Sequence, residues 1–132
     1  MLKLIPAVLI VILSLTGCVT DNQGSNRWSV PQRVDLHTRL GFAYLQQGRL
    51  AAAQEELEFA LTLGPDDSSA HHAMALLKLQ LGHAALAREH YERAIVADPG
   101  NYLVRNDFGS HLCGLGLHLE GIDQLTIAVN DP

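Results

Sequence analysis

Residues Leu40 to Pro65 read LGFAYLQQGRLAAAQEELEFALTLGP, and this stretch decides the fold of the chain. Its pattern returns twice at a step of 34 residues (82 − 48 = 34 and 116 − 82 = 34), most clearly in Gly48, Gly82 and Gly116. Small residues recur at the same step, at Ala53, Ala87 and Gly121. Glycine ends helices cheaply and small residues let two helices pack closely, so each copy predicts a pair of antiparallel helices.

A period of this length, with small residues where helices touch and proline at the exit, resembles the tetratricopeptide repeat (TPR). We therefore predict an all-α TPR superhelix of about three helix-turn-helix units, at residues 34–67, 68–101 and 102–132. The sequence stops where a further unit would begin, and we expect the array to be shortened at its C-terminus.

Local signals place the helices within each unit. Ser29 precedes Pro31, a first-turn proline, and Asp67 or Ser68 and then Asn101 can cap the first helices of the next two units. The predicted helices therefore cover residues 31–47, 49–63, 69–81 and 83–98, and another begins after Asn101. The last helix carries apolar residues with no following unit to cover them, namely Ile122, Leu125, Ile127 and Val129.

The composition is that of a globular chain, with 48% hydrophobic residues among 132 and a formal net charge of −5. No basic stripe is visible, so we expect no nucleic-acid partner. The chain also offers no Gly-rich phosphate loop after a strand, and we expect neither a small-molecule substrate nor a cofactor.

The N-terminus has the features of a targeting segment. A short positive start is followed by an apolar run at residues 4–13 and then by Leu15-Thr16-Gly17-Cys18, which resembles a bacterial lipobox. The resemblance implies a lipoprotein signal peptide at residues 1–17, a lipidated Cys18 with a flexible tether at 18–30, and a TPR domain at 31–132. An ordinary secretory signal with a chance cysteine is the alternative.

A second resemblance lies in the third repeat, where residues 105–116 read RNDFGSHLCGLG. This segment is similar to one in the PilF/PilW family of type IV pilus biogenesis lipoproteins, matching at Asn106, Gly109, Leu112, Cys113 and Gly116. The resemblance implies a pilotin, a lipid-anchored protein at the periplasmic face of the outer membrane that helps the pilus secretin to assemble there. A generic outer-membrane TPR scaffold for cell-envelope enzymes is the alternative from another class.

In TPR arrays the first helices line a concave groove, through positions 2, 5, 9, 12 and 13 of each unit. Of the residues at these positions, we predict that the partner-binding groove consists of Thr38, Phe42, Leu45, His72, Leu76, Leu79 and Asn106. The apolar centre suits a short helix or an extended peptide. The alternative is that these side chains only pack against neighbouring helices.

The sequence shows no catalytic constellation, so we expect no enzyme activity. The seven histidines lack metal-ligand spacing, and we expect them to be solvated surface residues with no metal site. Cys113 stands mid-helix with no basic residue placed to activate it, which predicts a buried, inert thiol.

Overall fold

The computed structural model describes residues 28–130, and these residues form six α-helices and no strand. The helices are α1 (Val30–Gln46), α2 (Leu50–Leu63), α3 (Ser68–Gln80), α4 (Ala84–Ala97), α5 (Tyr102–Gly114) and α6 (His118–Asn130). The helix ends predicted from the sequence are confirmed to within two residues. The predicted signal peptide, Cys18 and most of the predicted tether lie outside the described residues.

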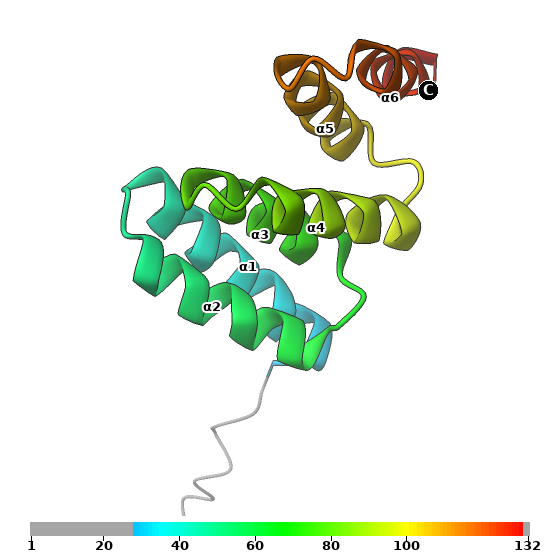
Figure 1. Cartoon of the computed structure of the whole chain (residues 1–132). Helices are drawn as coiled ribbons and strands as arrows, with labels where there is room; N and C mark the ends of the chain where they lie inside the picture. The colour runs from blue at the N-terminus through cyan, green and yellow to red at the C-terminus, as the bar shows by residue number, and fades with distance from the viewer. Residues whose placement is uncertain (1–27, 131–132) are drawn as a thin grey trace, which may run out of the picture.

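Consecutive helices pair as three antiparallel hairpins, α1 with α2, α3 with α4 and α5 with α6, which stack along one direction (Figure 1). The first helix of each later hairpin packs on the hairpin before it: α3 contacts both α1 and α2, and α5 contacts α4. The stack is therefore a succession of similar units in which each hairpin covers an apolar face of its neighbour.

The predicted caps are present at the start of each first helix. Ser29 and Gln32 form a capping box on α1, the Asp67 carboxylate accepts a hydrogen bond from the Ala70 N–H, and the Asn101 side chain accepts one from the Val104 N–H. Each cap satisfies a backbone donor that has no partner within its helix, which is why these three helices begin where they do.

The three periodic glycines lie in the turns between the two helices of each hairpin. Gly48, Gly82 and Gly116 have φ of 72°, 78° and 80°, and they are the only described residues with positive φ. An L side chain at this φ is strained, so the turn itself requires glycine and reappears once per unit.

Within the hairpins, the two helices approach so closely that a β-carbon does not fit at several positions. A Cβ added at Gly41 would lie 2.6 Å from Leu57 Cγ, and one added at Gly109 would lie 2.8 Å from Leu125 Cγ and 2.9 Å from the Gly121 carbonyl oxygen. At Gly121 it would collide with the Cys113 sulfur. The small-residue pattern in the sequence is therefore a packing requirement.

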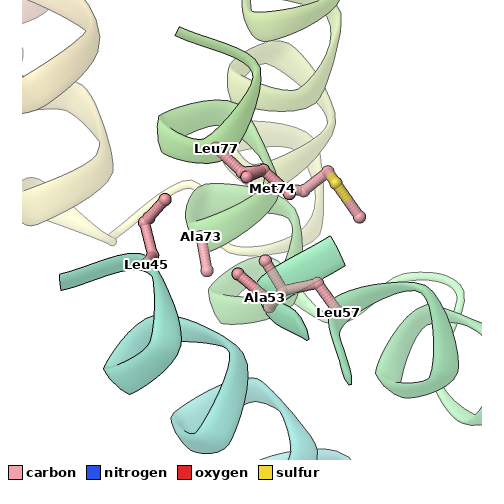
Figure 2. Close-up of a cluster of buried hydrophobic side chains, with 6 residues drawn as sticks. All are labelled: Leu45, Ala53, Leu57, Ala73, Met74 and Leu77. Carbon is pink, nitrogen blue, oxygen red and sulfur yellow. The ribbon is translucent and has the colours of Figure 1, made fainter. Parts of the chain in front are cut away.

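Two clusters of buried side chains join the hairpins. Figure 2 shows the first, in which Leu45 of α1 and Ala53 and Leu57 of α2 surround Ala73, Met74 and Leu77 of α3. The second cluster joins α3, α4 and α5 and contains a stacked ring pair, Tyr91 and Phe108, with centroids 5.0 Å apart. Burial of each large side chain contributes about 1.5–3 kcal/mol, so these clusters supply much of the free energy that holds the stack together.

Each hairpin also carries one polar side-chain pair at the same repeat position. The pairs are His37 with Glu56 at 2.6 Å, His71 with His90 at 3.0 Å and Arg105 with Gln124 at 2.9 Å. The position of the pair is repeated, while the chemistry of its side chains changes from hairpin to hairpin.

Within residues 28–130, none of the helices combines the length and the apolar character that crossing a bilayer requires.

The tight contact at Gly109 gives a stability prediction. Gly109→Ala should lower the free energy of unfolding by about 1–3 kcal/mol, because the added Cβ would lie 2.9 Å from the Gly121 carbonyl oxygen, a backbone atom that cannot move away without shifting α6. Gly114→Ala in the same helix is the matched control, since an added Cβ there meets nothing within 4 Å. It should leave stability unchanged or raise it by up to about 1 kcal/mol. Urea unfolding followed by circular dichroism measures both, and equal effects of the two changes would contradict the packing account.

Candidate functional site

The first helices of the three hairpins share a cavity of about 350 Å³ on one side of the stack. It is lined from α1 by Thr38, Arg39, Phe42, Ala43 and Gln46, from α3 by Ser69, His72 and Ala73, and from α5 by Leu103. Because the hairpins are stacked, their first helices each contribute residues to this cavity, although those residues are far apart in the sequence.

The cavity combines apolar walls with a few polar groups. Phe42 and Leu103 are large apolar side chains that remain exposed although the cavity lies between helices. Thr38 is buried, and its hydroxyl has no hydrogen-bond partner within the described residues. A buried hydroxyl without a partner costs free energy, so a ligand that supplied a hydrogen bond here would recover it.

One wall of the cavity carries a hydrogen-bonded His–Asp pair. The His72 ring nitrogen Nε2 lies 2.8 Å from a carboxylate oxygen of Asp107, which brings α3 and α5 together. The carboxylate accepts, so Nε2 carries the hydrogen and donates it. Asn106 is exposed next to this pair, and its amide nitrogen donates to the other Asp107 oxygen at 3.4 Å.

The structure brings three of the predicted groove residues together in this cavity, namely Thr38, Phe42 and His72. Leu45 is instead buried in the cluster that joins the first two hairpins, where it cannot reach a partner. Leu76 and Leu79 are half-buried and pack against the clusters, and Asn106 lies beside the cavity rather than in its lining.

The predicted groove set omits several lining residues. The position rule places three of them on the groove side, namely Gln46, Ser69 and Leu103, but they are not in the predicted set. Arg39, Ala43 and Ala73 stand outside those positions, and no signal in the sequence marked them. The repeat position gives the side of the helix on which a residue lies, but it does not say which leucines are buried against neighbouring helices.

The expectation that the histidines are solvated surface residues is wrong for several of them. His71 is buried, and its Nε2 donates to the Pro65 carbonyl oxygen at 2.8 Å. Its Nδ1 therefore has a free lone pair, which accepts from His90 Nδ1 at 3.0 Å.

Burial also shifts the acidity of these rings. Burial first, and then electrostatic interactions with His71, Arg93 and Lys78, lower the pKa of His90 to about 4. Burial lowers the pKa of His111, whose Nε2 is enclosed without a hydrogen-bond partner. Desolvation disfavours a charged imidazole, which explains the direction of both shifts.

The remaining reactive groups do not gather. Within residues 28–130, no three His, Cys, Asp or Glu side chains are placed to hold a metal ion together. Cys113 is half-buried, less than predicted, and its sulfur faces the backbone of Gly121 in α6. A larger depression of about 740 Å³ runs along α4 and the turn before α3, and no predicted groove residue lines it.

Two family models described as tetratricopeptide repeat match the chain, one over residues 34–77 and one over residues 68–101. The two matches together cover just over half of the chain. The chain belongs to the tetratricopeptide-repeat family. The all-α TPR fold predicted from the sequence is thereby confirmed.

Among proteins of known role, this TPR chain is similar to the type IV pilus assembly protein PilF of Pseudomonas aeruginosa, with 31% identity over 127 residues. That match covers 94% of this chain and 50% of PilF, so the chain spans half the length of this relative. Cellulose synthase 1 operon protein C of Komagataeibacter xylinus is 35% identical over 69 residues, 52% of this chain and 5% of that protein.

The solved structures agree with the sequence matches. The structure described as the functional characterization of Pseudomonas aeruginosa PilF has a TM-score of 0.75 and 30% identity, and covers 77% of this chain and 46% of its own. MamA has a TM-score of 0.67 at 24% identity, covering 74% of this chain and 57% of its own, which shows the fold alone. The resemblance to PilF predicted from the third repeat is confirmed as homology.

The His71–His90 pair predicts how this TPR stack responds to acid. The pKa of His90 is lowered in the folded chain, so between pH 6.5 and about 4 the unfolded chain binds a proton there that the folded chain does not. The free energy of unfolding should therefore fall as pH falls through this window. His90→Gln keeps a donor for His71 and removes the titrating ring, so its dependence on pH should be weaker.

Urea unfolding at several pH values in this window measures the effect. His83→Gln is the control, because His83 is exposed at the start of α4, and this variant should keep the slope of the unchanged protein. A slope that is equal in His90→Gln and the unchanged protein would rule out His90 as the sensor.

Proposed function

We propose that this protein is a lipid-anchored assembly factor for type IV pili, which binds the pilus secretin through the cavity formed by α1, α3 and α5. The observation that supports it most is the similarity to PilF, which covers 94% of the chain and so includes part of the N-terminal segment before residue 28. A TPR stack recognises partners by surface shape, so the proposed role involves no catalytic step.

The cavity has the properties that such recognition requires. Phe42 and Leu103 offer exposed apolar surface from two different helices. An apolar side chain of a short helix or an extended peptide of the secretin would lie against these two side chains. The partner's backbone or a polar side chain would reach the His72–Asp107 pair.

The lipid anchor in this proposal is Cys18, in the segment that resembles a lipobox. Several acyl chains hold a protein at a bilayer far more firmly than one, since each buried methylene contributes about 0.8 kcal/mol. Val19, rather than aspartate, follows the cysteine, which by analogy with lipoprotein sorting favours the outer membrane. The domain would then face the periplasm, where a secretin precursor passes.

Phe42 gives the test of the groove. Phe42→Ala removes an aromatic ring that is 38% exposed and lines the cavity, so it should weaken secretin capture by about tenfold or more and leave the fold intact. Phe59→Ala is the matched control, because Phe59 is 41% exposed on α2 and lies outside the cavity. Co-purification of the secretin from solubilised envelopes, with thermal unfolding of each variant, measures the two effects.

Unchanged secretin capture by folded Phe42→Ala would remove the cavity from the proposal. Recovery of cell-wall enzymes in place of a secretin by the unchanged protein would favour the scaffold reading instead.

Cys18 gives the test of the anchor. Cells grown with labelled palmitate should incorporate the label into the unchanged protein and into Cys113→Ser, which retains the lipobox. Cys18→Ser should carry no label, because the thiol that receives the lipid is gone. Label on Cys18→Ser, or its absence from the unchanged protein, would overturn the proposed anchor.

A further inference from the structure

Within the described residues, the stack leaves one apolar face open at each end. The tail face, on α6, consists of Ile122, Leu125 and Val129, and the head face, on α1, consists of Leu36 and Leu40. The two faces are not alike. One belongs to the second helix of a unit and the other to the first helix of a unit.

The interior of the stack shows what normally covers such faces. Leu40 stands at the repeat position of Met74 and Phe108, each 34 residues on from the last. Met74 and Phe108 are 3% and 4% exposed because each packs on the preceding hairpin, whereas Leu40 is 36% exposed. The head face is therefore the surface that α3 and α5 bury, and among residues 28–130 no hairpin precedes it.

The tail face follows the same rule in reverse. Leu125 occupies the repeat position of Leu57 and Tyr91. Those two side chains are wholly buried beneath the following hairpin, whereas Leu125 is only half-buried. Val129 occupies the position of Leu61 and Ile95, which are half-buried against the clusters, and it is 83% exposed. The tail face is the surface that α2 and α4 present to the next unit.

We propose that the tail face of one copy of this chain binds the head face of a second copy, so that α6 meets α1 as α2 meets α3 and α4 meets α5. The two halves of this contact are already on the chain, and the contact continues an interface that the chain forms twice within itself. Such a head-to-tail contact is heterologous, and it lengthens the stack instead of closing it.

Repeat equivalence gives the partners across the contact. Leu125 of one copy takes the place of Tyr91, and Leu40 of the next takes the place of Phe108, so an aliphatic pair replaces the ring stack. Val129 likewise lies against Leu36, as Ile95 lies in the cluster with Val104. Each pair removes apolar surface from water.

The polar bridges between units also change in a compatible way. Within the chain, Arg88 and Glu120 form an ion pair at 2.8 Å. At the equivalent position between two copies, Ile122 lies against Ala52, and both of these side chains are apolar. The His72–Asp107 pair becomes Asn106 against Arg39, and the Asn106 carbonyl can accept from the guanidinium. No like charges face each other at these positions, and no buried charge loses its partner.

Net charge favours the same pairing. Helix α6 carries Glu120 and Asp123 and no lysine or arginine, while α1 carries Arg33 and Arg39 with a single acid, Asp35. Two tail faces brought together would juxtapose acidic helices, whereas a tail and a head are complementary. This asymmetry is why we infer a head-to-tail contact and not a symmetric one.

Sedimentation of the protein as purified from membranes, in density-matched detergent, tests the proposal. The average mass of the unchanged protein should rise by about twofold or more as its concentration is raised about a hundredfold. Val129→Glu blocks the tail face and Leu40→Glu blocks the head face, and each variant alone should remain monomeric. An equal mixture should form dimers and nothing larger, because one intact tail still meets one intact head.

The control is Val96→Glu, since Val96 is a valine on α4 that is 81% exposed and lies outside both faces, and this variant should associate like the unchanged protein. An unchanged protein that is monomeric at every concentration overturns the proposal. A mixture of the two folded variants that stays monomeric also overturns it. So does association that Val129→Glu abolishes and Leu40→Glu leaves intact, because that result would show a tail-to-tail contact. If Leu40→Glu fails to fold, Leu40→Ser takes its place.

Discussion

The closeness of the two helices in each hairpin is the constraint on which the rest of the structure depends. Gly41, Gly109 and Gly121 leave no space for a β-carbon, and the facing alanines Ala53 and Ala87 are wholly buried. Because the helices approach this closely, each hairpin is thin and has an apolar face on either side. Hairpins of this kind bury those faces against one another, which produces the stack, the cavity between its first helices and, within residues 28–130, an open face at either end.

Much of this was predictable from the sequence, because the period is a direct record of the packing. The recurring glycines gave the turns, and Ser29, Asp67 and Asn101 gave the helix starts, since caps and left-handed turns are local chemistry. The groove was predictable only in part. A repeat position tells on which side of the helix a residue lies, but Leu45 shows that contact with the next hairpin can bury a side chain expected to face the groove.

The histidines illustrate a different limit. His71 is polar, and composition rules place it at the surface, yet the structure buries it with two hydrogen bonds. Its partners, the Pro65 carbonyl and His90, lie 6 and 19 residues away, so only the folded hairpin brings them together. A buried polar residue is intelligible once its partners are known, and a single sequence gives no list of partners.

The polar pair that recurs in each hairpin has a consequence for how the chain finds its fold. A protein built from helices of similar pattern risks mispairing, with a first helix joining the wrong second helix. The hydrogen-bonding groups at this repeated position differ from hairpin to hairpin, in the pairs His37–Glu56, His71–His90 and Arg105–Gln124. If α5 paired with α4, for example, Arg105 would lie opposite His90. The Arg105 guanidinium would then lose the Gln124 amide oxygen as its acceptor, and its permanent positive charge would face a hydrogen-bond donor of His90. Chemistry that differs at one repeated position thus distinguishes otherwise interchangeable parts during assembly.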